Sequence, residues 1–224
     1  MNISIFDVIG PVMIGPSSSH TAGAARLARV AGMIAKRFVT HVSFDLHGSF
    51  ARTYKGHGTD KALVAGVLGM AEDDENIVNA FKLAELRGLT YEINTVVLEN
   101  QHENSVRFAF TLDNGELFNV TGSSLGGGRI LITQIGEFSV ELSAQSPALL
   151  IQHRDRTGVV GEITNILAQN NINIATMKLS RRAKGDLAFS VIETDNPLGI
   201  GIENVISAIS DVLYVKSVDT GAEV

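Results

Sequence analysis

The chain has 224 residues, a formal net charge of −6 and no cysteine. A hydrophobic content of 45% and a charged content of 19% are typical of a folded globular protein. Without cysteine, this chain alone holds no disulfide, catalytic thiol, cysteine-ligated zinc or iron–sulfur cluster. The acidic balance argues against nucleic-acid binding, because nucleic-acid-binding proteins neutralise phosphates with basic residues. No apolar run approaches the ~20 residues of a membrane helix, and no secretory signal opens the chain, so we expect a cytoplasmic protein that does not enter membranes.

The first part of the chain, residues 1–146, predicts an irregular α+β domain. Small residues over 21–37 predict a closely packed helix, and helices are also expected over 60–70 and 75–86. Strands are expected over 42–46, 91–98, 106–112, 117–120, 129–133 and 138–142. The glycine-rich segment 122–128 is expected to form a loop. A change of composition at Ser146-Pro147 marks the expected domain boundary.

The second part, residues 147–224, has a regular pattern of apolar residues that predicts each of its elements. Strands are expected over 148–152, 172–180, 187–193 and 214–218, and helical stripes begin at Val159 and Ile202. The resulting order β-α-β-β-α-β is the ferredoxin-like split βαβ arrangement. Its exposed sheet edge is a natural place for two copies of the chain to pair, so we expect a homodimer contact here.

The segment Gly15-Pro16-Ser17-Ser18-Ser19-His20-Thr21 places hydroxyls and a histidine immediately before a helix. A helix N-terminus offers free N–H groups and a positive dipole end to a carboxylate. The segment therefore suits a small polar anion that needs a proton moved. An ordinary N-cap with a surface histidine explains the same residues. A Ser–His nucleophile is less favoured, because no nucleophile elbow surrounds these serines.

A second segment, residues 48–61, contains His57 between two glycines, followed by Thr59 and Asp60 at the start of a helix. A helix N-terminus therefore again meets a histidine and a hydroxyl. A plain Asp or Thr helix cap, with the glycines making the turn, explains this pattern too. A third segment, residues 121–129, is a wide turn that could cradle an anion through its backbone, although it is neither a P-loop nor a dinucleotide fingerprint.

The sequence predicts neither a metal site nor a pyridoxal phosphate site. The six histidines are scattered without metal-ligand spacing, so no metal site is predicted. Pyridoxal phosphate needs a Schiff-base lysine and a phosphate cup, and neither Lys55 nor Lys61 lies in such an arrangement.

The motifs GPSSSHTAGAARLA, GSFARTYKGHGTDKAL and TGSSLGGGRI resemble those of the beta chain of iron–sulfur-dependent L-serine dehydratases. The resemblance covers essentially the whole chain. The first domain also resembles the allosteric substrate-binding domain of some phosphoglycerate dehydrogenases. The C-terminal part, with its DRTGVVGEI turn, resembles an ACT domain, a module that usually binds amino acids for regulation.

The resemblance implies conversion of L-serine to pyruvate and ammonia. In this family a [4Fe-4S] cluster acts as a Lewis acid on the serine hydroxyl, and its cysteines belong to a separate alpha chain. The absence of cysteine here agrees with that division. The expected partners are therefore a cysteine-containing alpha chain and the small molecule L-serine.

Matched to the family motifs, His20, Ser19 and Thr21 are the expected catalytic residues. His20 would transfer a proton or orient a group, unless the alpha chain supplies the base. The expected substrate-binding residues are Ser17, Ser18, His57 and Asp60.

In the ACT-like part, an effector is expected near Asp155, Gly158, Asn173 and Ile174, at a dimer interface. The effector would be serine or a monovalent cation, and the sequence does not decide between them. Two other functions remain open: a non-catalytic regulatory protein that binds amino acids, and a stand-alone hydrolase.

Overall fold

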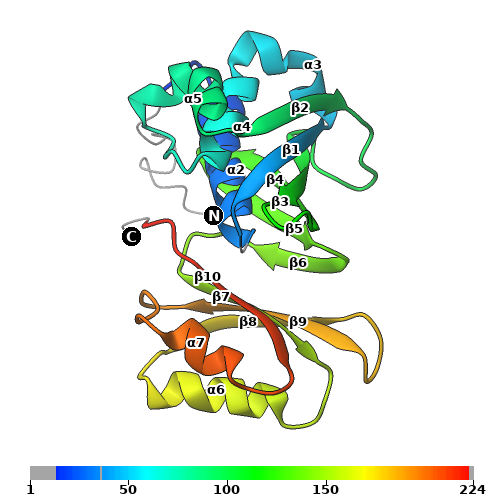
Figure 1. Ribbon diagram of the computed structural model, residues 1–224, viewed down its shortest axis with the longest axis vertical. Coiled ribbons are helices and arrows are strands. Elements are labelled where there is room, and N and C mark those ends of the chain that lie inside the picture. The colour runs from blue at the N-terminus through cyan, green and yellow to red at the C-terminus, as the bar shows by residue number, and fades with distance from the viewer. Residues whose placement is uncertain (1–13, 36, 222–224) are drawn as a thin grey trace, which may run out of the picture. The chain divides into compact units, whose positions relative to one another are not determined.

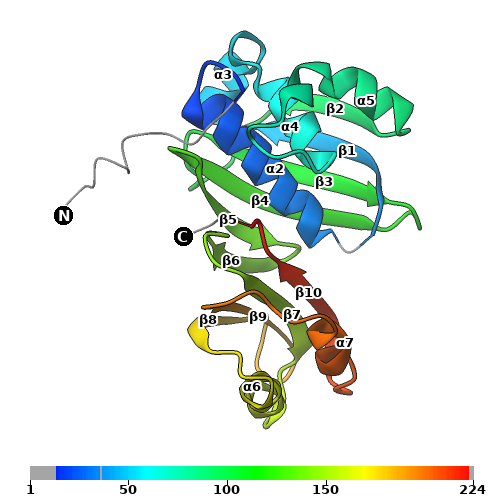
Figure 2. The same cartoon turned by 90° about the vertical axis from the view of Figure 1, so that its left-hand side faces the viewer.

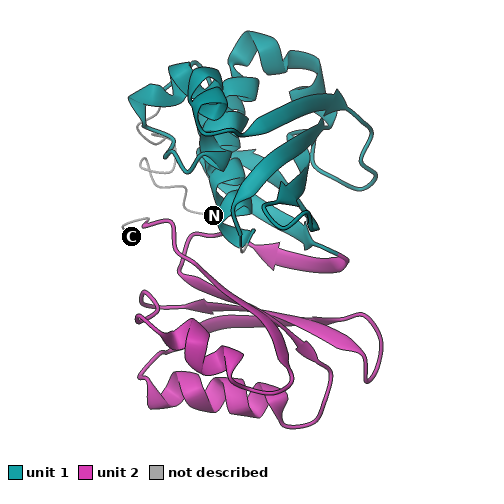
Figure 3. Ribbon diagram, in the orientation of Figure 1, with its two compact units in different colours: residues 1–136 teal, residues 137–224 magenta. Residues whose placement is uncertain are grey.

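The computed structural model describes residues 14–35 and 37–221. The chain divides into two compact units, residues 1–136 and 137–224 (Figure 3). This division lies N-terminal to the domain boundary expected at residue 146, which stays a prediction. In the described part of the chain, no helix is both long enough and apolar enough to cross a membrane.

Unit 1 combines helices with a mainly antiparallel sheet. Its helical elements are η1 (Ser18–Ala22, a π-helix), α2 (Gly23–Ile34), α3 (Gly48–His57), α4 (Thr59–Val67), η2 (Glu75–Asn79, a 3₁₀-helix) and α5 (Ala80–Leu86). Its strands are β1 (Val39–Leu46), β2 (Thr90–Thr95), β3 (Ser105–Leu112), β4 (Leu117–Gly126) and β5 (Arg129–Ile135). They lie side by side in the order β2-β1-β3-β4-β5, with β1 and β2 parallel and the other pairs antiparallel.

The core of unit 1 follows from alternation along its strands. Val42, Phe44 and Leu46 on β1 are fully buried, as are Phe108 and Phe110 on β3. Alternate side chains of a strand share one face, so these residues form one apolar face of the sheet. Helices α2 and α4 lie together against the sheet (Figures 1 and 2).

Small residues bring α2 and α4 unusually close. A Cβ atom at Gly66 of α4 would lie 2.2 Å from the Ala25 carbonyl oxygen of α2. The expectation that the small-residue helix packs tightly is therefore confirmed, and its N-terminal turn is the π-helix η1.

Unit 2 contains the predicted ferredoxin-like order. After β6 (Phe138–Leu142) come β7 (Ala148–Arg154), α6 (Val159–Gln169), β8 (Ile174–Arg181), β9 (Leu187–Thr194), α7 (Ile202–Ser207) and β10 (Val212–Val218). Strands β10-β7-β9-β8 form an antiparallel sheet in that order. Its core includes Leu149 and Ile151 of β7, Ile163 and Leu167 of α6, and Ile206 of α7. The predicted α+β class is confirmed.

Two local features differ from the sequence prediction. Residues 48–57, for which no helix or strand was predicted, form helix α3, and Gly58 ends it in the left-handed conformation. The predicted loop 122–128 is largely strand, because β4 continues to Gly126 and only a short turn precedes β5. In both places glycine marks the end of an element, because Gly58 follows α3 and Gly126 ends β4.

Candidate active site

Ser17 opens η1 as its N-cap. Its hydroxyl oxygen accepts a hydrogen bond from the His20 amide at 3.1 Å, and its backbone conformation is extended. Ser17 Oγ also lies 3.3 Å from Ser19 Oγ. Ser17 therefore caps the helix and also belongs to a row of neighbouring hydroxyls. π-Helical turns occur frequently at functional sites.

Both ring nitrogens of His20 are engaged by serine hydroxyls. Nδ1 lies 3.0 Å from Ser19 Oγ, and Nε2 lies 3.1 Å from Ser49 Oγ at the start of α3. The ring of Phe50 meets the imidazole edge-on, with centroids 5.1 Å apart. These contacts fix the orientation of the His20 ring.

His57, at the last residue of α3, lies against His20. The two imidazole centroids are 5.0 Å apart at an interplanar angle of 39°. Nδ1 of His57 donates to the Thr53 carbonyl oxygen at 3.3 Å, because a carbonyl can only accept. No described side chain forms a hydrogen bond with His57 Nε2, so in the neutral ring this nitrogen keeps a free lone pair.

Thr21 connects η1 to the end of α3. Its hydroxyl donates to the His57 carbonyl oxygen at 3.0 Å, and the residue is 3% exposed. Thr21, which was predicted to be catalytic, therefore contacts the backbone of His57. Ser18 differs, since no side-chain hydrogen bond of its hydroxyl is found in the described part of the chain.

Electrostatics favour a neutral His20. Partial burial lowers its pKa below the ordinary 6.5, and the neighbouring His57 lowers it further. At neutral pH the His20 ring therefore carries one proton, and it donates one hydrogen bond and accepts the other.

A third segment supports the site from β4. The fully buried Ser124 donates its hydroxyl to the Ser19 carbonyl oxygen at 2.9 Å. This contact requires Gly23, because a Cβ atom there would lie 2.0 Å from Ser124 Oγ. The segment for which an anion cradle and a wide turn were both considered therefore contributes a strand residue that holds η1 in place.

Asp60 is not brought to the histidines. Its carboxylate accepts from the Lys61 amide at 2.8 Å, and its charge raises the pKa of Tyr91 after the larger effect of burial. Within the described residues, we find no hydrogen bond from Asp60 to His20 or His57.

In unit 2, the predicted effector residues form two separate groups. Asp155 accepts a hydrogen bond from the Gly185 amide at 2.8 Å and lies 3.3 Å from Arg181. The Gly185 contact, and secondly Arg181, hold the pKa of this carboxyl below its ordinary value. Gly158 precedes α6 with a φ of 98°.

Asn173 and Ile174 lie at the other end of the same sheet. The Asn173 amide donates to Asp195, and Ile174 pairs with Thr194 on β9. Arg181, beside Asp155, ends the eight-residue strand β8, and it lies about 23 Å from Ile174 at ~3.3 Å per residue. One chain therefore does not bring Asn173 and Ile174 to Asp155 and Gly158.

Comparison with known proteins bears on these motifs. The family model described as "Serine dehydratase beta chain" matches residues 4–89, and the ACT domain model matches residues 148–211. The L-serine dehydratase beta chain of Peptoniphilus asaccharolyticus is 39% identical over 217 residues, which cover 96% of this chain and 98% of the relative. The chain belongs to the serine dehydratase beta chain family.

Two longer relatives each contain a segment that is similar to most of this chain. L-serine dehydratase TdcG of Escherichia coli (strain K12) is 28% identical over 220 residues, covering 85% of this chain and 46% of that protein. D-3-phosphoglycerate dehydrogenase of Bacillus subtilis (strain 168) is 29% identical over 197 residues, covering 88% of this chain and 37% of that protein. The sequence of this chain is thus similar to segments of two longer proteins.

Three site residues of this family member were missing from the sequence prediction: Ser49, Phe50 and Ser124. All three lie inside the family motifs, so the motifs contained the signal. Thr53 lies between Ser49 and His57 at a spacing of four residues, which puts all three on one face of a helix. Because no helix was predicted over residues 48–57, this spacing did not indicate a shared face.

Proposed function

We propose that this chain is the beta subunit of a two-chain L-serine dehydratase, which converts L-serine to pyruvate and ammonia. The observation that carries the proposal is the His20–His57 pair, with ring centroids 5.0 Å apart, among the hydroxyls of the family motifs. A histidine with a free lone pair beside fixed hydroxyl donors suits removal of a proton next to a bound carboxylate.

The cluster of this family does not fit the present chain. There is no cysteine to ligate it, and no group of three or more potential ligands lies together in the described residues. We assign the [4Fe-4S] cluster, and with it activation of the serine hydroxyl, to a separate cysteine-containing alpha chain. TdcG supports this division, because more than half of its length lies outside the match. No step assigned to the present chain passes through the cluster.

His57 is the stronger candidate for the base. Its Nδ1–H is used by the Thr53 carbonyl, which leaves Nε2 to accept the Cα proton of serine. Both nitrogens of His20 already contact serine hydroxyls. This assignment revises the expectation that His20 acts on the proton and gives His20 the orienting role.

The hydroxyls divide between binding and positioning. Ser18, whose hydroxyl remains available, would donate to the substrate carboxylate. Ser17 and Ser19 fix the turn around His20. Thr21 is a positioning residue, because it contacts the His57 backbone.

The chemistry balances without an oxidant. Loss of the Cα proton and the Cβ hydroxyl as water gives an enamine, which tautomerises to an imine. Addition of one water and loss of ammonia then give pyruvate. One water leaves and one is consumed, so the atoms of serine are those of pyruvate and ammonia together.

For the ACT-like part, we propose an amino-acid effector site shared by two copies of the chain. Asn173 precedes β8, and Asp155 lies beside Arg181 at its other end. An effector that contacts both residue types must therefore contact Asp155 of one protomer and Asn173 of another. Serine is the preferred effector and a monovalent cation the alternative. Such a ligand alters activity only by binding one state more tightly than the other.

The test is anaerobic affinity isolation of the full chain from its own cells, with immediate assay for pyruvate from L-serine. We expect a cysteine-containing chain and iron to co-elute with pyruvate-forming activity. Isolation of the chain without iron or pyruvate formation would overturn the proposal and favour a non-catalytic amino-acid sensor.

A further inference from the structure

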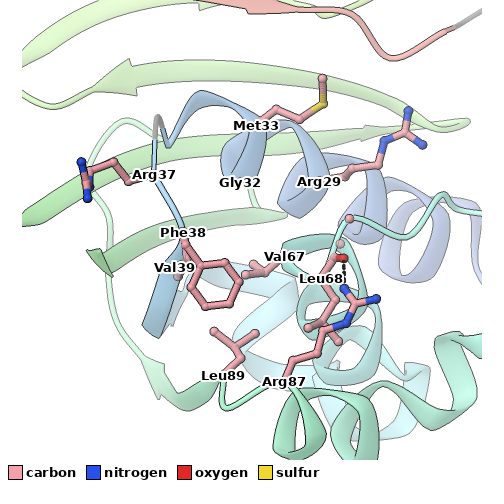
Figure 4. A pocket seen from close by; sticks show the side chains of 12 residues that line it. Arg29, Gly32, Met33, Arg37, Phe38, Val39, Val67, Leu68, Arg87 and Leu89 are labelled. Carbon is pink, nitrogen blue, oxygen red and sulfur yellow. Dashed lines mark hydrogen bonds between the residues drawn. The ribbon is translucent and has the colours of Figure 1, made fainter. Parts of the chain in front are cut away.

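A cavity in unit 1 lies apart from the candidate active site. Its volume is about 300 Å³, and its lining comes from α2, α4, the start of β1 and the residues that follow α4 and α5 (Figure 4). The lining contains no residue of η1 or α3. Whatever this cavity binds is therefore distinct from a substrate held at His20 and His57.

The charged part of the lining consists of three arginines, without an aspartate or glutamate. Arg37 is neutralised by Asp113, whose carboxylate accepts from its Nε at 2.6 Å. Arg29 lies 4.0 Å from Glu72. Neither Asp113 nor Glu72 belongs to the lining, and these two carboxylates offset the charges of two of the three arginines.

Arg87 is the third and differs from the other two. Its Nη1 donates to the Leu68 carbonyl oxygen at 2.9 Å, which holds the guanidinium at the cavity (Figure 4). No carboxylate lies within 4.0 Å of it among the described residues. An arginine fixed at one nitrogen, with further N–H groups to donate, is arranged for a carboxylate.

The rest of the wall is apolar. Phe38, Val39 and Leu89 lie across the same hollow from Leu68 (Figure 4). Phe38 is 59% exposed, so its ring is accessible to a ligand in the cavity. The cavity thus combines one available cation with an apolar surface.

We propose that this cavity binds a small monocarboxylate with an apolar body. The carboxylate pairs with Arg87, and the body packs on Phe38 and Leu89. An amino acid is disfavoured, because the lining offers no carboxylate to its ammonium group. The site is independent of the proposed dehydratase function.

The test measures binding of 4-methylpentanoate to the ¹⁵N-labelled full chain by two-dimensional NMR. We expect saturable shifts centred on the amides of Gly32, Gly66 and Gly69. Arg87→Gln should weaken binding at least tenfold, since it removes a charge-assisted pair. Lys82→Gln, the same charge change on the exposed side of α5, should stay within about twofold.

A steric variant provides a second, charge-neutral test. At Gly32 the nearest atoms to a Cβ lie 3.7 Å away, so Gly32→Ala should fold and bind normally. Gly32→Leu should fill the cavity and abolish binding. Equal loss in both variants would contradict a ligand in this space.

Three probe results would overturn the proposal. They are binding of the uncharged 4-methylpentanamide as tightly as the acid, binding of inorganic phosphate as tightly as the acid, and shifts that spread over surface arginines without saturation. The first would remove Arg87 from recognition. The second would indicate a general anion site, and the third would indicate nonspecific binding.

Discussion

At the scale of single residues, the candidate site depends on which ring nitrogen is free. His57 donates through Nδ1 to Thr53 and keeps Nε2, whereas both nitrogens of His20 have hydroxyl partners. The two histidines are close in space but have different chemical capacities.

This difference predicts unequal mutants. His57→Gln in the reconstituted two-chain enzyme should lower kcat by about 10²–10⁴-fold with a small change in KM, as expected for loss of a base. His20→Gln should have a smaller effect on kcat. His41→Gln, at a partly exposed histidine that is hydrogen-bonded to Thr90, is the matched control. Equal kcat for His57→Gln and the control would refute the assignment.

The pKa of His20 gives a second prediction. Its NMR titration in the full chain should lie below 6.5 and move upward in His57→Gln, but not fully, because burial is the larger cause. Between the lowered value and 6.5 the unfolded chain binds more protons, so this histidine's contribution to stability rises with pH, is complete above 6.5 and is lost on acidification. A His20 pKa at or above 6.5 would contradict the described environment.

At the scale of elements, helix α3 delivers the second half of the site. Ser49, Thr53 and His57 recur every four residues, so one face of the helix carries the His20 contact, the carbonyl acceptor and the base. Strand β4 contributes differently, because Ser124 holds the backbone of η1 rather than a reacting group.

The contact between η1 and β4 predicts that a methyl group is not tolerated at Gly23, whereas an uncrowded helical glycine tolerates one. Gly23→Ala should displace Ser124 and destabilise the chain by about 1–3 kcal/mol, as overpacking does. Gly161→Ala, inside α6 with no atom within 4 Å of its Cβ, should be neutral or stabilising by up to about 1 kcal/mol. Urea unfolding measures both, and equal midpoints would show that Ser124 moves aside freely.

At the scale of the whole molecule, the two proposed effector groups lie at opposite ends of one sheet. Asp155 is held beside Arg181, and Asn173 beside Asp195. Because the distance is set by the length of β8, rotation of side chains cannot close it.

This arrangement predicts complementation between variants. Asp155→Ala and Asn173→Ala homodimers should each lose serine binding, measured calorimetrically, if every site takes one residue from each protomer. An equimolar mixture after subunit exchange should regain about a quarter of the wild-type sites, because half of the dimers carry one intact site. No recovery, despite demonstrated exchange, would place the two residues in unrelated roles.

The sequence by itself determined the features that depend on local spacing and composition. Apolar periodicity predicted the ferredoxin-like order, and the lack of cysteine excluded a cluster held by this chain. The motifs indicated His20 and His57 but not their contact. Helix α3 was not predicted, because glycines at 48, 56 and 58 are poor helix formers. Only the tertiary structure decided that Ser49, 29 residues along the chain, meets His20, that Ser124 supports Ser19, and that Asn173 lies far from Asp155. These relations depend on strand register and on where a helix ends, which are fixed by packing between distant segments rather than by local pattern.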